Sequence, residues 1–282
     1  MGLRVNTNVA SLNAQRNLYN TTTKFHKSME RLSSGMRINR SGDDAAGLAI
    51  SESLKSDIRA MQQASRNAAD GVSLVQVAEG ALDEVNNILL RIRELAEQAA
   101  TETLGDQERA YLDQEYQELL AEVDRIAATA EFNGIKLLDG TAGSLDVQVG
   151  IGVDVLTSAV SIDLTSPMDT TQLALFGTSL QGNPPDGGDT ARALMGQIEA
   201  ATGTVSQLRA GFGAAQNRLE TSIRSIGMTA ENLAAANSRI RDVDVALETS
   251  TMTSLQILQQ AGVSILSQAN VSSQLALSLL QG

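Results

Sequence analysis

Few residues in this chain of 282 are of types that do chemistry, and their spacing does not favour a catalytic or metal site. Cysteine is absent, which excludes disulfides, thiolate metal sites and cysteine nucleophiles, and the single histidine, His26, excludes a multi-histidine metal site. Asp43 and Asp44 are adjacent acids without further ligands nearby, a pattern typical of a helix start. The Gly-Ile-Gly run at 150–152 lacks the Lys-Ser/Thr of a nucleotide loop and indicates a turn. We therefore predict no enzyme, no cofactor and no metal.

The charge of the chain is negative overall and unevenly distributed. A formal net charge of −12 argues against nucleic-acid binding through phosphate neutralisation. Residues 1–40 hold seven Lys or Arg and one acid, whereas residues 249–282 hold no charged residue. Half of that uncharged run is Gln, Ser, Thr or Asn, which argues against membrane insertion. The first fifteen residues lack the apolar core of a cleaved secretory signal peptide.

The elements that must position any functional residue are mostly helices. Apolar residues recur at steps of three and four between residues 54 and 96, 112 and 130, and 194 and 233. All three prolines lie within residues 167–185, so the long stretches on either side contain no helix breaker of that kind. The pattern predicts a mainly α fold, in which long heptad helices form an elongated coiled-coil or helical-bundle rod.

The middle of the chain has a different pattern. Apolar and polar residues alternate over 145–149 and over 160–164, which predicts two strands of a small β-hairpin within a region of about 141–188. Residues 165–190 are rich in Thr, Gly, Pro and Asp and predict a loop at the tip of the fold. The chain is thus expected to run out through helices, turn over, and return through one long helix, which brings its two ends together.

Both terminal regions also show heptad-like spacing, and the C-terminal one presents a conflict. A helix with a solvated face normally carries charge there, and residues 249–282 carry none. Burial by other copies of the same chain resolves the conflict, and head-to-tail contacts that do not close would then give a helical filament. The residues expected to form this core polymerisation stripe are Leu255, Leu258, Ile265, Ala269 and Leu279.

Several long motifs resemble those of bacterial flagellin. Residues 31–51 read RLSSGMRINRSGDDAAGLAIS and resemble the N-terminal signature of that family. Residues 131–140 read EFNGIKLLDG, and residues 229–246 read TAENLAAANSRIRDVDVA, and both are similar to flagellin segments in the same order. The similarity covers about residues 3–140 and 190–280, which makes the chain look like a minimal flagellin that lacks large outer domains.

The resemblance implies a domain organisation and a function. Residues 1–44 and 237–282 would form a discontinuous, coiled-coil filament-core domain, and residues 45–236 an outer helical rod. The chain would be a structural subunit that polymerises into the extracellular flagellar filament for swimming motility, after export by the flagellar type III pathway. The implied partners are other copies of the chain, an export chaperone, the filament cap and hook-associated junction proteins.

The resemblance also implies one recognition surface outside the terminal helices. By motif, Arg91, Leu95 and Glu115 match three positions of flagellins. At these positions flagellins make axial subunit contacts, and a vertebrate Toll-like receptor binds the same positions. Glu97 stands where many recognised flagellins have Val, which is a departure from the pattern.

Two other functions within the same family of architectures remain open from the sequence. A hook–filament junction protein shares the terminal architecture, but that family typically has Asp-Asp-Pro where this chain continues from Asp44 with Ala-Ala-Gly. A flagellin homologue that serves as a cell-surface receptor is the other. An unrelated soluble coiled-coil adaptor would carry charged, water-facing terminal helices, contrary to residues 249–282.

Overall fold

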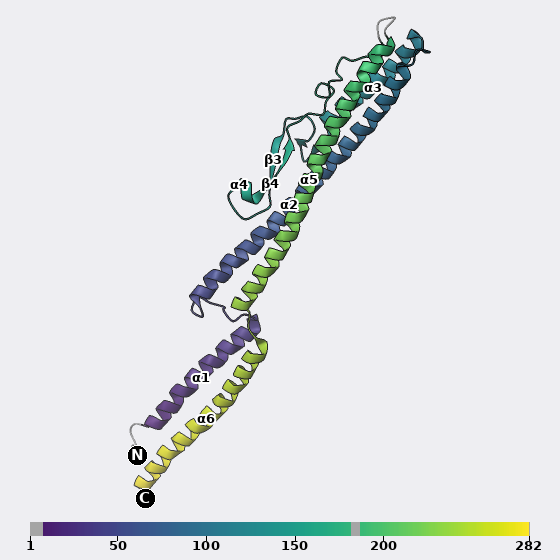
Figure 1. The fold of residues 1–282 in the computed structure, drawn as a ribbon. Coiled ribbons are helices and arrows are strands. Elements are labelled where there is room, and N and C mark those ends of the chain that lie inside the picture. Colours follow the sequence, from purple (N-terminus) through teal and green to yellow (C-terminus); the bar gives the residue numbers. More distant parts are fainter. Residues whose placement is uncertain (1–7, 182–186, 282) are drawn as a thin grey trace. The chain divides into compact units, whose positions relative to one another are not determined.

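A computed structural model describes residues 8–181 and 187–281 of the chain, without the side chains of Val155, Gly187 and residues 272–281. Long helices dominate it, as the sequence predicts, and they divide into two compact units, residues 1–56 with 232–282 and residues 57–231 (Figure 1). The helices are α1 (Val9–Ser34), α2 (Ala45–Ala99), α3 (Asp106–Thr129), α4 (Val155–Ser158), α5 (Gly187–Arg241) and α6 (Val245–Gln281). The strands are β1 (Glu131–Phe132), β2 (Ile135–Lys136), β3 (Gly143–Gln148) and β4 (Ala159–Leu164).

The first unit consists mainly of α1 and α6, which lie side by side and antiparallel (Figure 1). Along each helix the half-buried residues recur at steps of three and four, which places them in a seam between the two helices. On α1 they include Ser11, Ala14, Leu18, Phe25 and Leu32, and on α6 Met252, Leu255, Gln259, Gly262, Leu266 and Ala269. The seam therefore mixes small, polar and apolar side chains.

The second unit is a bundle of α3 with the parts of α2 and α5 that belong to it. On α2, five fully buried residues lie seven positions apart: Ala68, Val75, Leu82, Leu89 and Ala96. On α5 the same spacing joins the buried residues Ile198, Val205, Phe212, Leu219 and Ile226. The heptad pattern of the sequence is therefore the pattern of the core, and the predicted helices are confirmed.

The turn between α2 and α3 is held by a buried cation. Arg109 is 8% exposed, and its guanidinium donates to the carbonyl oxygens of Ala99 at 3.2 Å and Thr101 at 3.1 Å. These carbonyls belong to the last residue of α2 and to the turn after it, where backbone acceptors lack helical partners. The first turn of α3 contains two acids, Asp106 and Glu108, whose negative charge is favourable at the positive end of the helix dipole.

The predicted β-hairpin is confirmed. Strands β3 and β4 pair antiparallel with Leu145 opposite Ile162 and Val147 opposite Val160. A second, smaller hairpin joins β1 to β2 through a two-residue turn, in which Asn133 has φ 50° and Gly134 has φ 79°. Both residues tolerate positive φ, so this Asn-Gly pair suits the tight turn.

Residues 165–181 form turns and bends without helix or strand, as expected of a loop, but most of their apolar side chains are buried. Met168, Leu173, Leu175 and Leu180 are each at most 3% exposed. The composition of this stretch indicated a polar loop at a tip, whereas the described part packs onto the bundle. The remainder of the predicted tip, residues 182–186, lies outside the described residues.

Candidate assembly surface

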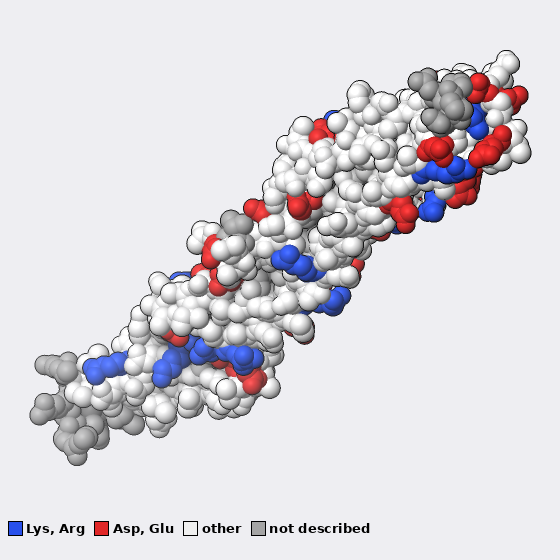
Figure 2. All heavy atoms as spheres, turned by 45° about the horizontal axis from the view of Figure 1, so that its top comes forward, with Lys and Arg blue, Asp and Glu red and all other residues white. Residues whose placement is uncertain are grey.

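The outward faces of α1 and α6 carry large apolar side chains in contact with solvent. Exposure of a single apolar residue is common, but among the described side chains four such residues lie on α1 and seven on α6. They are Val9, Leu12, Tyr19 and Met29 on α1, and Val245, Leu247, Ile257, Leu258, Val263, Ile265 and Val271 on α6, each between 43% and 73% exposed. Figure 2 shows Lys and Arg in several separate groups along the surface, with broad uncharged areas between them.

Members of the predicted polymerisation stripe differ in how far they are buried. Leu258 is 57% and Ile265 60% exposed, so α1 covers neither of them fully. Leu255 and Ala269 are half-buried in the seam with α1, and the side chain of Leu279 lies outside the described residues. The packing of α1 therefore covers part of the stripe and leaves Leu258 and Ile265 uncovered. The role of these residues in polymerisation stays a prediction.

Small and polar groups fix how α1 pairs with α6. The side chain of Asn8 accepts a hydrogen bond from the backbone N–H of Ser11, which caps α1, and its Nδ2 donates to the carbonyl oxygen of Ala269 at 2.9 Å. The hydroxyl of Ser11 bonds Asn270 Oδ1 at 2.9 Å. At Gly262 an added Cβ would lie 3.2 Å from Leu18 Cδ1, so a larger residue would press on α1. These contacts set the register of the pair.

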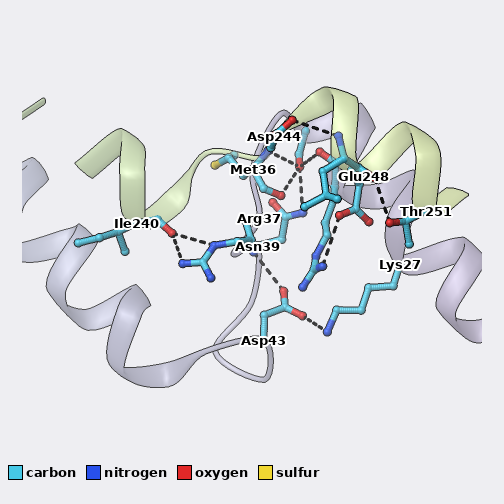
Figure 3. Close-up of polar contacts among 12 residues, drawn as sticks. Lys27, Met36, Arg37, Asn39, Asp43, Ile240, Asp244, Glu248 and Thr251 are labelled. Atoms are coloured by element: carbon cyan, nitrogen blue, oxygen red, sulfur yellow. Dashed lines mark hydrogen bonds and ion pairs between the residues drawn. The ribbon is translucent and has the colours of Figure 1, made fainter. Parts of the chain in front are cut away.

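A polar clasp, defined here as Lys27 to Asp43 together with Ile240 to Glu248, closes one end of the α1–α6 pair (Figure 3). Helix α1 ends at Gly35, whose φ of 70° is the left-handed conformation that favours glycine. The carbonyl oxygen of Gly35 accepts from Val243 N at 3.0 Å, and Arg37 N donates to Arg241 O at 2.7 Å. The Arg37 guanidinium also donates twice to Ile240 O, at 2.6 and 3.2 Å. This helix end is absent from the sequence-based predictions, although a glycine after a helical stretch, here Gly35, is a signal that could have indicated it.

Ion pairs complete the clasp. Lys27 Nζ lies 2.6 Å from Asp43 Oδ1, and the Asp43 carboxylate also accepts from the backbone N–H groups of Asn39 and Arg40 (Figure 3). The hydrogen bond from Lys27, followed by those from the backbone, lowers the pKa of Asp43 from 3.8 to about 2. Arg31 Nη1 lies 3.7 Å from a carboxylate oxygen of Glu248.

The two predicted acids at 43 and 44 therefore have separate structural roles. Asp43 joins the clasp, and Asp44 Oδ1 accepts from Gly47 N at 2.9 Å, at the start of α2. An oxygen acceptor in this place satisfies a backbone donor that has no helical partner. His26 lies on α1 with its ring centroid 6.1 Å from that of Phe25, at an edge-on angle of 66°.

The three residues of the predicted recognition surface differ in exposure, because Arg91 and Glu115 are about half exposed and Leu95 is buried. Arg91 on α2 donates to Glu115 Oε1 on α3 from Nε at 2.9 Å and from Nη2 at 2.8 Å, and from Nη1 to Glu94 at 2.9 Å. The hydrogen bond with Glu115, more than that with Glu94, raises the pKa of Arg91 above its ordinary value. Leu95 is 1% exposed and belongs to the core, so its side chain is not available to a partner. Glu97 lies 3.6 Å from Arg93.

Among the described residues, no group of three or more His, Asp and Glu side chains is placed to hold a metal ion. No described helix is long and apolar enough to cross a membrane. The described residues do offer a pair of terminal helices with uncovered apolar faces, and a separate helical bundle with its own core.

Comparison with known proteins gives one consistent result. Residues 5–143 match the family model described as the bacterial flagellin N-terminal helical region, and residues 195–280 match that of the C-terminal helical region. The flagellin of Halalkalibacterium halodurans is 45% identical over 277 residues, which cover 98% of this chain and 99% of that protein. The flagellin of Bacillus subtilis is 41% identical over 99% of this chain and all of its own length.

The flagellar filament 33 kDa core protein of Treponema phagedenis is 41% identical over 98% of this chain and 99% of its own. Among solved structures, the crystal structure of Bacillus cereus flagellin matches with a TM-score of 0.50 and 32% identity. That match covers 61% of this chain and 94% of the other. The likeness is thus to flagellins and filament core proteins over nearly the whole sequence.

Fold and surface together indicate a class: a structural subunit of a self-assembling helical polymer. The family matches then give the particular case, because the chain belongs to the bacterial flagellins. It is a structural subunit of the bacterial flagellar filament, which serves motility.

Proposed function

We propose that the subunit enters the filament by burying the outward faces of α1 and α6 against other copies of the chain. The observation that carries this proposal is α6 itself: from residue 249 onward it has no ionisable side chain, yet Ile257, Leu258, Val263 and Ile265 are more than half exposed. A water-facing helix normally carries charge on its outer face. We therefore infer that this uncharged surface of α6 is buried against protein.

The energetics favour this reading. Full burial of a large aliphatic side chain contributes about 1.5–3 kcal/mol, so covering the remaining half contributes about 1 kcal/mol for each residue. The exposed apolar side chains that the structure describes, four on α1 and seven on α6, would then supply on the order of 10 kcal/mol per subunit, against the entropy lost on association. Such a balance allows a filament that is stable but still grows from free subunits.

The proposed domain roles follow from the same surface. Residues 1–44 and 237–282 form the filament core, and residues 45–236 form the outer rod. The polar clasp supports this division, because it fixes the end of α1 to the start of α6 through backbone hydrogen bonds at Gly35 and Arg37. The terminal pair then acts as one unit when other copies cover it.

Export and localisation complete the proposed mechanism. The subunit passes through the flagellar type III pathway without a cleaved signal peptide and assembles outside the cell. An export chaperone covers α6 beforehand, and the filament cap and hook-associated junction proteins meet the subunit at the filament ends. The absence of cysteine supports passage through a narrow channel, because no disulfide can form in the chain.

The proposed second contact surface contains fewer accessible residues than the sequence predicts. Arg91 and Glu115 are about half exposed and are held together by hydrogen bonds, so they present a rigid charged pair to an axial neighbour or to a vertebrate Toll-like receptor. Leu95 contributes to this surface only by supporting α2 from within the core.

The experiment that tests the proposed function removes residues 250–282 and compares the truncated chain with the full one. We expect a helical monomer that no longer polymerises, because the second unit keeps its own core. Analytical sedimentation with added filament seeds measures assembly, and circular dichroism measures helicity. Filaments of the truncated chain with the stability of the full-length ones would refute the proposal.

A further inference from the structure

One large aromatic side chain of the second unit is held out in solvent. Phe176 is 74% exposed, although it lies in the segment 165–181 between β4 and α5, whose other large apolar side chains are buried (Figure 1). Its neighbour Leu175 is fully buried. The segment therefore places the side chain of Leu175 in the core and the next side chain, that of Phe176, in solvent.

The backbone around Phe176 is firmly anchored to α3. The Asp113 carboxylate accepts from the Ser179 hydroxyl at 2.9 Å and from Leu180 N at 2.7 Å. The Asp124 carboxylate accepts from the N–H of Thr170 at 2.8 Å and from its hydroxyl at 3.0 Å. These bonds fix the segment on both sides of the exposed ring.

The local conformation adds a second constraint. The N–H groups of Leu175 and Phe176 both donate to Thr170 O, at 2.9 and 3.0 Å. Ala174 has φ 55°, which is uncommon for a residue with a Cβ, and Gly177 has φ 71°. Backbone strain of this kind persists where the surrounding structure enforces it, and it is often found at sites that bind. A rigidly presented aromatic residue is the usual anchor of a protein interface.

The same unit contains an apolar pocket of about 340 Å³. It lies between α2 and the two hairpins, and Leu74, Phe132, Leu145 and Val147 contribute to its lining. Benzene enters a protein cavity of about 150 Å³, so a phenyl ring fits here. Gly71 belongs to the lining as well, and there an added Cβ would lie 3.1 Å from Val147 Cγ2.

The ring and the pocket of one subunit are too far apart to meet. The pocket is level with residues 67–74 of α2, whereas Phe176 lies beside the part of α3 that includes Glu115, the partner of Arg91. Twenty residues of α2 separate position 71 from position 91, which corresponds to about 30 Å at 1.5 Å per residue. An insertion must therefore join two copies that are offset along the helix axis.

We propose that Phe176 of one subunit inserts into this pocket of a neighbouring copy in the filament. This inference rests on the proposed function, because it requires copies that assemble. Each subunit would offer its ring to one neighbour and its pocket to another, and such a head-to-tail contact does not close, so it propagates along a filament.

Charge favours Phe176 over the other exposed apolar group near the hairpins. Residues 170–181 contain no charged residue, and the pocket has Asp70 and Asp146 in its lining. The turn between β3 and β4 exposes Val153 and Leu156 but carries Asp154 between them, which would meet two like charges at the pocket. A second copy's uncharged segment is the better occupant.

A crosslinking experiment tests the contact, and the absence of native cysteine makes it specific. Filaments of the double variant Asn67→Cys with Phe176→Cys are treated with a short bismaleimide and analysed on a denaturing gel. We expect a ladder of covalent multimers, since position 67 lines the pocket. Each single variant should stay monomeric, as should the control that pairs Phe176→Cys with Glu199→Cys on the exposed side of α5.

Two results would overturn the inference. One is a monomer band from the filaments of the Asn67–Phe176 pair. The other is a ladder from Asn67→Cys with Val153→Cys in its place, which would assign the pocket to the hairpin turn.

A second variant covers the case in which the double variant does not polymerise. Phe176→Ala should raise the concentration of unpolymerised subunit at equilibrium about tenfold, while the melting temperature of the monomer stays unchanged because the ring is exposed. An unchanged concentration would refute the proposed contact. The proposed function would still stand in that case, because it fails only if the chain without residues 250–282 polymerises.

Discussion

Replacement of Ile265 gives the sharpest test of how the terminal helices assemble. Ile265 lies on the outward face of α6 and is 60% exposed, so a substitution there leaves the seam with α1 intact. Full burial of such a side chain contributes about 1.5–3 kcal/mol, and the exposed share corresponds to about 1–2 kcal/mol. At 1.4 kcal/mol for each factor of ten, Ile265→Ala should raise the concentration of unpolymerised subunit about 5- to 25-fold.

Ile265→Asp should have a larger effect, because assembly would then bury an unpaired carboxylate. We expect no filaments at concentrations at which the parent chain polymerises fully. The assay is sedimentation over a series of total concentrations, in which the plateau of the supernatant gives the unpolymerised concentration. Circular dichroism should show unchanged helicity for both variants.

The matched control is Gln268→Ala, an exposed polar position on the same helix, which should leave the plateau unchanged. If Ile265→Asp polymerises with the plateau of the parent chain, the outward face of α6 is not a subunit contact. If helicity of the second unit collapses instead, the two units do not fold separately.

Three further predictions concern stability. The pKa of Asp43 is lowered from 3.8 to about 2, so its carboxylate stabilises the clasp fully above about pH 4. This stabilisation is lost as the pH falls through about 2. Asp43→Asn should remove this pH dependence, which hydrogen exchange of the backbone near Gly35 measures. Gly71→Ala should destabilise the second unit by about 1–3 kcal/mol through overpacking, whereas Gly80→Ala, with open space around it, should stabilise α2 by about 0.5–1 kcal/mol in denaturant titrations. Tyr116→Phe removes the partly buried hydrogen bond to Thr178 and should lower the melting temperature by about 2–4 °C.

The sequence predicts the long helices well because their cores repeat every seven residues. Val75, Leu82 and Leu89 on α2 show the repeat both in the sequence and in their burial. The hairpin is predictable for the same kind of reason, since the alternation around Val147 and Val160 survives as paired strands. Local periodicity is therefore sufficient to predict a helix or strand when a single neighbouring element buries one of its faces.

Where the packing of a neighbouring element decides which side of a helix is buried, the sequence alone does not predict the burial. Leu95 and Ala96 are adjacent and both buried, because the core covers a wide arc of α2, so a matching motif could not indicate that Leu95 is hidden. On α6, apolar residues occur on several sides, and the packing of α1 decides that Leu255 faces the seam while Leu258 does not. Exposure of Phe176 depends on hydrogen bonds to α3 that no local pattern reveals.

The anchoring of residues 165–181 also makes the stretch between Gln181 and Gly187 a place to add sequence. Leu180 on one side is held by Asp113, and Ala191 on the other is fully buried in α5. A foreign peptide inserted between these two fixed points would leave both intact. Because the chain is a filament subunit, each filament would then display that peptide once per subunit, as a dense and regularly spaced array.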